Sequence, residues 1–384
     1  MSKPVSRTDL LKSVKKVVIK VGSGVITGKH GLNTDIIDGL AKDICSLRED
    51  GIEVIMVSSG AIASGLRKLG FTKRPQSVSE QQAMAAVGQS GLMMAYEKAF
   101  GFYHSKVAQV LITRDDLAHR RRYLNTRNTL RTLLSWKIIP IINENDTVVV
   151  DEIKFGDNDN LSAMVTNLTE SHLLINLTNI DGLFDKDPRV NKDAMLIKVV
   201  DKVDRRIMKY AGSIPGFLGT GGMASKIRAA RKAALGGVST IIANGLKPRI
   251  LKQIFIGKEE GTLFHARDTS LCSRKQWIAF TKSPNGEIVI DRGAEAALMH
   301  NGKSLLPSGI TEVKGRFSLG DSVLLMNSSG EKLAVGLVNY HSGDIKKIIG
   351  VRTDEIESKL GFKHDNEVIH RDNLVFSEQI EIFK

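Results

Sequence analysis

The segment Gly219-Thr220-Gly221-Gly222-Met223-Ala224-Ser225-Lys226 combines residue types that bind phosphate groups. Glycines have no side chain, so backbone amides can come close to a phosphate there. Residues 225–235 are predicted to form a helix, whose N-terminus adds partial positive charge, and Lys226 adds a full charge. The spacing is not that of the P-loop, in which the lysine directly follows the last glycine. A plain glycine-rich surface turn is the alternative interpretation.

A second lysine, Lys20, lies near the carboxyl end of the apolar strand predicted for residues 17–21. A lysine there is unfavourable unless it meets an anion or reaches solvent. Gly22 and Gly24 follow it, as in a dinucleotide-binding turn. However, the third glycine of that motif is displaced, and the next strand ends in Ser58 rather than in the acid that holds a ribose. The sequence therefore disfavours a nicotinamide-dependent dehydrogenase.

Polar clusters follow other predicted strands. Ser58-Ser59-Gly60-Ala61 leads into a helical segment, where hydroxyls suit a carboxylate or phosphate, or simply cap the helix. Two further loops mix acids with amides, and clusters of this kind often form turns only. Their spacing does not match a calcium-binding loop. These two loops are Asn143-Glu144-Asn145-Asp146 and Gly156-Asp157-Asn158-Asp159-Asn160.

The clusters contain no strong general base. None of the nine histidines lies in them, and neither cysteine has the surroundings of a catalytic nucleophile. Transfer of a phosphoryl group to a carboxylate needs no such base, because the nucleophile is ionised at neutral pH. That reaction needs positioning, a metal and positive charge, so it fits these residues.

Strands and helices alternate over the first 270 residues, which predicts βαβ units and a mostly parallel sheet covered on both faces. The polar clusters follow strands, and ligands of such sheets bind beyond the carboxyl ends of the strands. The predicted strands are residues 17–21, 53–58, 106–112, 138–143, 172–177 and 240–243, and the predicted helices are residues 36–48, 79–100, 125–134, 160–168 and 226–235.

Short strands broken by turns follow after about residue 270, which predicts a small β-rich domain. We predict a first domain at residues 1–265, a linker at 266–285 and the β-rich domain at 286–384. Residues 271–384 hold 15 basic and 15 acidic residues, so the net charge of +13 belongs to the first 270 residues. A basic first domain suits an anionic small molecule or nucleic acid.

The two cysteines, Cys45 and Cys272, lie far apart, which fits a reducing compartment and argues against a zinc site or a disulfide framework. No apolar run approaches the ~18 residues of a membrane span, and the N-terminal segment lacks the apolar core of a secretory signal. We therefore expect a cytoplasmic protein.

Taken together, these motifs resemble the glutamate 5-kinases of the amino acid kinase family, which carry a C-terminal PUA domain. The resemblance runs from about Val17 to the end of the chain. It rests on five motifs in order and on two further motifs in the PUA-like part: residues 18–23, 58–62, 143–146, 156–163 and 219–223, and then residues 302–309 and 368–373. It implies a three-layer α/β sandwich with a mostly parallel central sheet, followed by a small β-rich PUA-like domain.

The resemblance also implies roles for individual residues. Lys20 and Lys226 would neutralise charge on the transferring phosphoryl group, and Asp159 would organise both lysines. Glutamate would be held by Ser59, Asp146 and Asn158. The ATP site would be lined by Lys20, Thr178, Asn179, Thr220, Gly221, Gly222, Met223, Ala224, Ser225 and Lys226. The family often has Thr-Asp where this chain has Thr178-Asn179.

The implied activity is ATP-dependent phosphorylation of the γ-carboxylate of L-glutamate, the first step of proline synthesis, with Mg²⁺ as cofactor and no dedicated protein metal site. Proline would be a feedback inhibitor, the chain would form a homo-oligomer, and the acyl phosphate would pass to a reductase. Other amino acid kinase-fold activities remain as alternatives, namely acetylglutamate, aspartate and nucleoside monophosphate kinases. An RNA-binding PUA protein is a further alternative, which the zero net charge of residues 271–384 disfavours.

Overall fold

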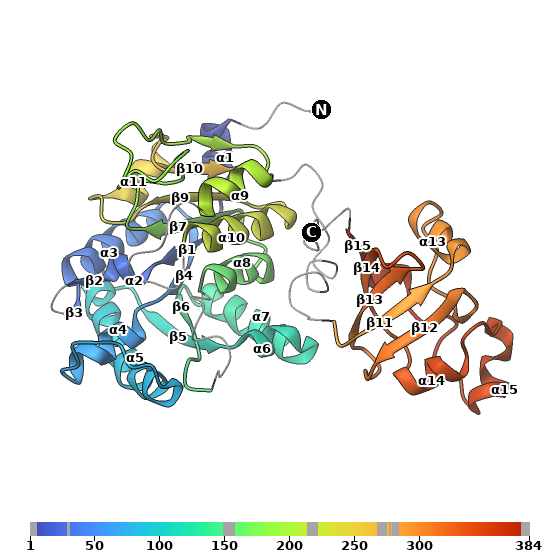
Figure 1. Cartoon of the computed structure of the whole chain (residues 1–384). Coiled ribbons are helices and arrows are strands. Elements are labelled where there is room, and N and C mark those ends of the chain that lie inside the picture. Colours follow the sequence, from blue (N-terminus) through green and yellow to red (C-terminus); the bar gives the residue numbers. More distant parts are fainter. Residues whose placement is uncertain are drawn as a thin grey trace. The chain divides into compact units, whose positions relative to one another are not determined.

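The computed structural model describes residues 6–28, 31–148, 158–212, 222–266, 275, 278 and 284–377. The chain divides into two compact units, Met1–Ser270 and Leu271–Lys384 (Figure 1). Within the described ranges, no helix combines the length and apolar character needed to cross a membrane. The domain boundaries given above remain a prediction.

The N-terminal unit is built on an eight-stranded sheet in the order β5-β6-β4-β1-β7-β9-β10-β8. Neighbouring strands are parallel except at β9 and β10, which are antiparallel. The predicted mostly parallel sheet is therefore confirmed. Its strands are β1 (Lys16–Val21), β4 (Glu53–Ser58), β5 (Val107–Ile112), β6 (Ile139–Glu144), β7 (Leu173–Thr178), β8 (Val199–Val200), β9 (Ser239–Asn244) and β10 (Thr262–Phe264), beside a small hairpin of β2 (Thr27–Gly28) and β3 (Gly31–Leu32).

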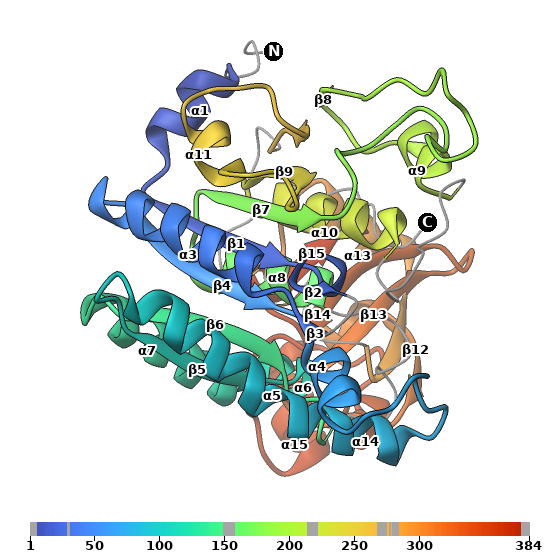
Figure 2. The same ribbon diagram turned by 90° about the vertical axis from the view of Figure 1, so that its left-hand side faces the viewer.

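Helices lie on both faces of this sheet (Figures 1 and 2). Helices α1, α3, α5 and α11 share one apolar core with the strands, while α8 and α10 pack on the opposite face. The helices are α1 (Arg7–Ser13), α2 (Ser23–Ile26), α3 (Thr34–Glu49), α4 (Ala61–Lys68), α5 (Val78–Gly101), α6 (Arg114–Ala118), α7 (Arg120–Ser135), α8 (Asn158–Leu168), α9 (Arg205–Gly212), α10 (Met223–Leu235) and α11 (Ile250–Phe255).

The predicted helices and strands of this unit are all present, with their ends shifted by a few residues. The largest shift is in α7, which begins at Arg120 rather than at residue 125. Its first turn consists largely of arginines, so no apolar period marks it in the sequence. The antiparallel strand β10 was not predicted, because three residues are too few for a periodic signal.

Alternation along β1 decides where its lysine points. Val17, Ile19 and Val21 belong to the apolar core shared with α3 and α5. Successive side chains of a strand point to opposite faces, so Lys20 lies on the face covered by α8. This places its ammonium group under the N-terminus of α8.

Two glycines bring α4 and α5 into backbone contact. A Cβ atom on Gly65 would lie 1.9 Å from the carbonyl oxygen of Met84, and one on Gly88 would lie 1.9 Å from that of Ala61. Any larger residue would force the helices apart. This close packing holds the start of α4, and with it the Ser58-Ser59-Gly60 turn, against the sheet.

The C-terminal unit has its own apolar core and a five-stranded sheet in the order β12-β11-β13-β14-β15. Within this sheet, β11 and β13 pair in parallel, and the other neighbouring strands pair antiparallel. The predicted β-rich second domain is therefore confirmed. Its elements are β11 (Gly286–Ile290), α13 (Arg292–Met299), η1 (Pro307–Gly309), β12 (Ile310–Gly315), β13 (Ser322–Asn327), β14 (Lys332–Leu337), α14 (Ser342–Lys347), η2 (Thr353–Glu355), α15 (Ile356–Leu360), η3 (Arg371–Asn373) and β15 (Leu374–Phe376).

Candidate active site

Polar residues gather where the central parallel strands β6, β4, β1 and β7 end. Because these strands are neighbours and run in one direction, their carboxyl ends lie side by side. Backbone hydrogen bonds tie the following loops together. The Ser59 amide donates to the Val21 carbonyl oxygen over 3.1 Å, and the Gly22 amide donates to the Leu177 carbonyl oxygen over 3.0 Å.

A buried carboxylate lies between two lysines in this region. Asp159, in the first turn of α8, is 1% exposed. Its Oδ1 lies 2.6 Å from the Lys20 Nζ, and its Oδ2 lies 3.3 Å from the Lys226 Nζ. Both lysines are also buried. Three segments far apart in the sequence thus bring together the predicted catalytic residues.

Two neutral donors complete the surroundings of this carboxylate. The Asn176 Nδ2 donates to Asp159 Oδ1 over 3.0 Å. The Ser225 hydroxyl donates to Asp159 Oδ2, and its oxygen also lies 2.8 Å from the Gly222 carbonyl oxygen. Each carboxylate oxygen therefore has one ammonium and one neutral donor. Ser225, which the family resemblance assigned to the ATP site, contacts Asp159 here.

The cluster carries one excess positive charge. Burial alone would raise the pKa of Asp159, but the charges of Lys20 and Lys226 outweigh it and hold that pKa well below its usual range. Burial lowers the pKa of Lys226, an effect that Asp159 opposes and Lys20 reinforces. Two buried ammonium groups around one carboxylate leave a net charge of about +1 with little solvent to stabilise it, so the cluster favours an anionic ligand.

A chain of amides links the N-terminus of α8 to the ends of β4 and β6. The Asn158 Nδ2 lies within hydrogen-bonding distance of the Ser59 Oγ at 2.8 Å and the Asn143 Oδ1 at 2.9 Å. Asn143 in turn donates to Gln89 Oε1 over 2.9 Å. The buried Asn158 Oδ1 meets no hydrogen-bond donor among the described residues. An ammonium or amide group of a ligand would satisfy it.

Asp146 follows β6 and is half-buried. Burial raises its pKa to about 6, against the opposing effect of the positive charge of Arg74. A carboxylate with so high a pKa is poorly stabilised as an anion, and a bound cation would stabilise it. Among the described residues, Asp146 makes no hydrogen bond to Ser59 or Asn158, so it lies in the neighbouring turn rather than in their amide chain.

Of the residues predicted to line the nucleotide site, those that the structure describes lie near the ends of β1 and β7 and at the start of α10. Gly222 is the N-cap of α10, and Met223 and Ala224 begin that helix. Thr178 ends β7, and its hydroxyl lies 3.5 Å from the Asn179 Oδ1. The exposed Asn179 side chain lies beside Gly24, which belongs to the short helix α2 that follows β1. Thr220 and Gly221, like Gly156 and Asp157, lie outside the described residues.

Asn176 and Gln89 are site residues that the sequence did not single out, whereas Asn143 was noted as part of the polar loop at residues 143–146 but was given no role. Asn176 is an amide within the apolar run of β7 and is fully buried. The argument that drew attention to Lys20, a polar side chain in an apolar strand, applies equally to Asn176. Gln89 carried no comparable signal, because it lies in a helix of mixed composition.

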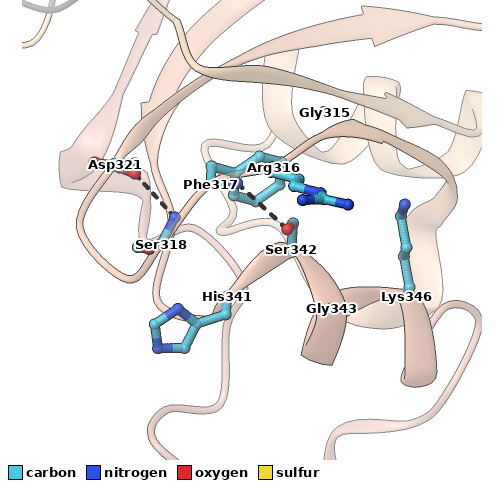
Figure 3. Close-up of a pocket in the computed structure, with 9 residues that line it drawn as sticks. All are labelled: Gly315, Arg316, Phe317, Ser318, Asp321, His341, Ser342, Gly343 and Lys346. Carbon is cyan, nitrogen blue, oxygen red and sulfur yellow. Dashed lines mark hydrogen bonds between the residues drawn. The ribbon is translucent and has the colours of Figure 1, made fainter.

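A separate pocket of about 460 Å³ lies in the C-terminal unit (Figure 3). Its walls are the turn after β12 and the start of α14, where the Phe317 amide donates to the Ser342 Oγ over 3.3 Å. None of the predicted site residues lines it. The pocket is lined by Gly315, Arg316, Phe317, Ser318, Asp321, His341, Ser342, Gly343 and Lys346.

Across the described ranges, no group of three His, Cys, Asp or Glu side chains could hold a metal ion.

Comparison with known proteins agrees with this architecture. Residues 15–244 match the model of the amino acid kinase family, and residues 286–360 match that of the PUA domain. Glutamate 5-kinases of Geobacter sulfurreducens and Geobacter metallireducens are 52% and 54% identical over 370 residues, which cover 96% of this chain and 99% of each relative. That of Syntrophus aciditrophicus is 50% identical over 369 residues, 96% of either chain. The chain therefore belongs to the amino acid kinase family and carries a C-terminal PUA domain.

Proposed function

We propose that this chain transfers the γ-phosphoryl group of ATP to the γ-carboxylate of L-glutamate, giving glutamyl 5-phosphate for proline synthesis. The observation that carries the proposal is the buried Asp159 between Lys20 and Lys226, with its excess positive charge. The relatives that match almost the whole chain are named glutamate 5-kinases, which supports glutamate as the acceptor.

Phosphoryl transfer to a carboxylate suits the charges of this cluster. A γ-carboxylate oxygen of glutamate would attack the γ-phosphorus, and the bond to the oxygen of ADP would break. The nucleophile is already ionised, so no residue has to remove a proton. Lys20 and Lys226 would stabilise the negative charge on the transferring group, and Asp159 would hold both ammonium groups in place.

We assign glutamate binding to Ser59, Asn158 and Asp146. The Ser59 hydroxyl and the amide of Asn158 lie 2.8 Å apart, and Asn158 directly precedes Asp159 in the chain. Asp146 would bind the α-ammonium group, which would relieve its raised pKa. An acetylated amino group is uncharged, so Asp146 favours a free amino acid over acetylglutamate.

We assign ATP to the loop before α10 and to the end of β7, through Lys20, Thr178, Asn179 and residues 220–226. The N-terminus of α10 offers backbone amides and partial positive charge to the phosphates. Mg²⁺, when bound with the nucleotide, would neutralise phosphate charge. It prefers phosphate oxygens and water over a dedicated set of protein ligands.

We further propose the cellular setting that the family resemblance implies. The chain would act in the cytoplasm as a homo-oligomer and would be inhibited by proline. Its acyl phosphate product is reactive, which favours rapid transfer to a reductase. RNA binding by the C-terminal domain is disfavoured by the zero net charge of residues 271–384.

The proposal is tested by measuring ADP formation with ATP and Mg²⁺ against a panel of free amino acids and N-acetylglutamate. Hydroxylamine in the assay would trap an acyl phosphate as a hydroxamate. We expect ADP and hydroxamate to form together with L-glutamate and not with N-acetylglutamate. ADP formation with aspartate or N-acetylglutamate but not with glutamate would assign the chain to another amino acid kinase activity.

A further inference from the structure

The amide of Asn176 occupies a position where an apolar side chain would be expected. It is fully buried in β7, within the sequence Leu-Leu-Ile-Asn-Leu-Thr. Its Nδ2 donates to Asp159 Oδ1, but its own Oδ1 meets no hydrogen-bond donor among the described residues. A buried polar atom without a partner costs stability. Folding alone therefore gives little reason for an amide here.

The position of Asn176 is set by the register of the sheet. Lys20 on β1 and Asn176 on β7 are directly paired residues. Paired residues of neighbouring strands point to the same face, and here that face is covered by α8. Both side chains therefore reach the same carboxylate oxygen, Lys20 over 2.6 Å and Asn176 over 3.0 Å.

The two neutral donors differ from the lysines in what they do during the reaction. The carboxylate of an aspartate rotates easily about its terminal bond. When the ammonium groups turn towards a phosphate, Asp159 loses some of the contacts that fix the orientation of its carboxylate plane. Asn176 on Oδ1 and Ser225 on Oδ2 remain as one neutral donor for each oxygen. They hold the carboxylate without adding charge that would compete for the phosphate.

We propose that Asn176 is a positioning residue, which fixes the orientation of the Asp159 carboxylate so that Lys20 and Lys226 are directed at the transferring phosphoryl group. The inference rests on the proposed catalytic role of Asp159 and the two lysines. Asn176 acts through Asp159 and would not touch either substrate. Its loss should therefore affect turnover rather than binding.

The test compares Asn176→Leu with the wild-type full chain. A lost hydrogen bond to a charged group should lower kcat by about 10- to 100-fold. KM for glutamate and for ATP should stay within about twofold, because uniform binding is retained. The midpoint of urea unfolding should be unchanged or higher, since the unpartnered amide oxygen is removed. A purely structural role would instead lower the midpoint and leave kcat of the folded enzyme unchanged.

Asn167→Leu is the matched control. Asn167 is also a buried asparagine, near the end of α8, whose side-chain amide has no hydrogen-bond partner among the described residues. We expect it to keep wild-type kcat. If Asn176→Leu does not fold, Asn176→Ala tests the same loss of a donor without added bulk, and the same fall in kcat is expected.

Wild-type kcat in the folded Asn176 variant would overturn the inference. Asp159→Asn, measured in parallel, separates this failure from that of the proposed site. If Asp159→Asn is fully active, the assignment of the catalytic cluster is wrong. If Asp159→Asn is inactive while Asn176→Leu is not, only the role of Asn176 is wrong.

Discussion

Replacing Lys226 with methionine is the sharpest test of the catalytic cluster. Methionine keeps most of the length and apolar surface of the lysine and removes its charge. The cluster then falls from a net charge of about +1 to zero. Asp159 keeps Lys20 at 2.6 Å, the amide of Asn176 and the hydroxyl of Ser225.

These contacts allow the effects on stability and on rate to be separated. Removing one member of an isolated buried ion pair costs several kcal/mol, because a buried charge is left uncompensated. Here Asp159 still has a buried cation, so we expect the free energy of unfolding to change by only about 1 kcal/mol. The transition state loses a positioned cation, which is commonly worth about 3 to 4 kcal/mol, or about 100- to 1000-fold in kcat.

The assay is ADP formation with glutamate at saturating ATP, together with urea unfolding of the same preparation. Lys232→Met is the control, since Lys232 lies on the same helix and its ammonium group contacts the Asn160 side chain. We expect the control to keep wild-type kcat. A Lys226→Met enzyme within about threefold of wild-type kcat would refute the assignment of Lys226 to charge stabilisation.

Three further predictions concern the substrate site and the second unit. The pKa of Asp146 is raised to about 6, so its ionised form is lost as the pH falls through 6. The value of kcat/KM for glutamate should therefore fall below that pH. Asp146→Asn should remove this part of the pH profile. Proline, like glutamate, carries a positively charged amine and an α-carboxylate, so it should compete with glutamate. Asp146→Asn should weaken the binding of both ligands. Inhibition that excess glutamate leaves unchanged would place proline at a different site. A chain ending at residue 270 should remain folded and active, because the proposed site residues all precede that point; a folded but inactive truncation would show that the C-terminal unit contributes to the site.

Much of the N-terminal unit was determined by local sequence. Alternating apolar strands and amphipathic helices are sufficient to predict βαβ units, since each element must bury one face. The same reasoning placed Lys20 near the carboxyl end of a strand and the polar clusters beyond the strand ends, where parallel strands bring them together. The change to short strands and turns after residue 270 likewise marked a second, β-rich domain.

The contacts that make the site were decided by tertiary structure. Spacing along the chain does not reveal that Asp159 lies between Lys20 and Lys226, which come from β1 and α10; only the family resemblance pointed to it. Asn176 was not predicted because it becomes significant only through its pairing with Lys20. That pairing depends on strand order and register, which are set by contacts between residues far apart in the sequence.

The close packing of α4 on α5 also depends on tertiary structure rather than on a local pattern. Gly65 and Gly88 look like weak points of two helices in the sequence, and glycine lowers helix propensity. In the fold they are the places where two backbones touch, which no local pattern encodes. Local patterns along the chain therefore predict the elements and the chemistry available at their ends. The tertiary structure decided which side chains share one buried carboxylate, because burial and charge pairing exist only once distant segments have packed.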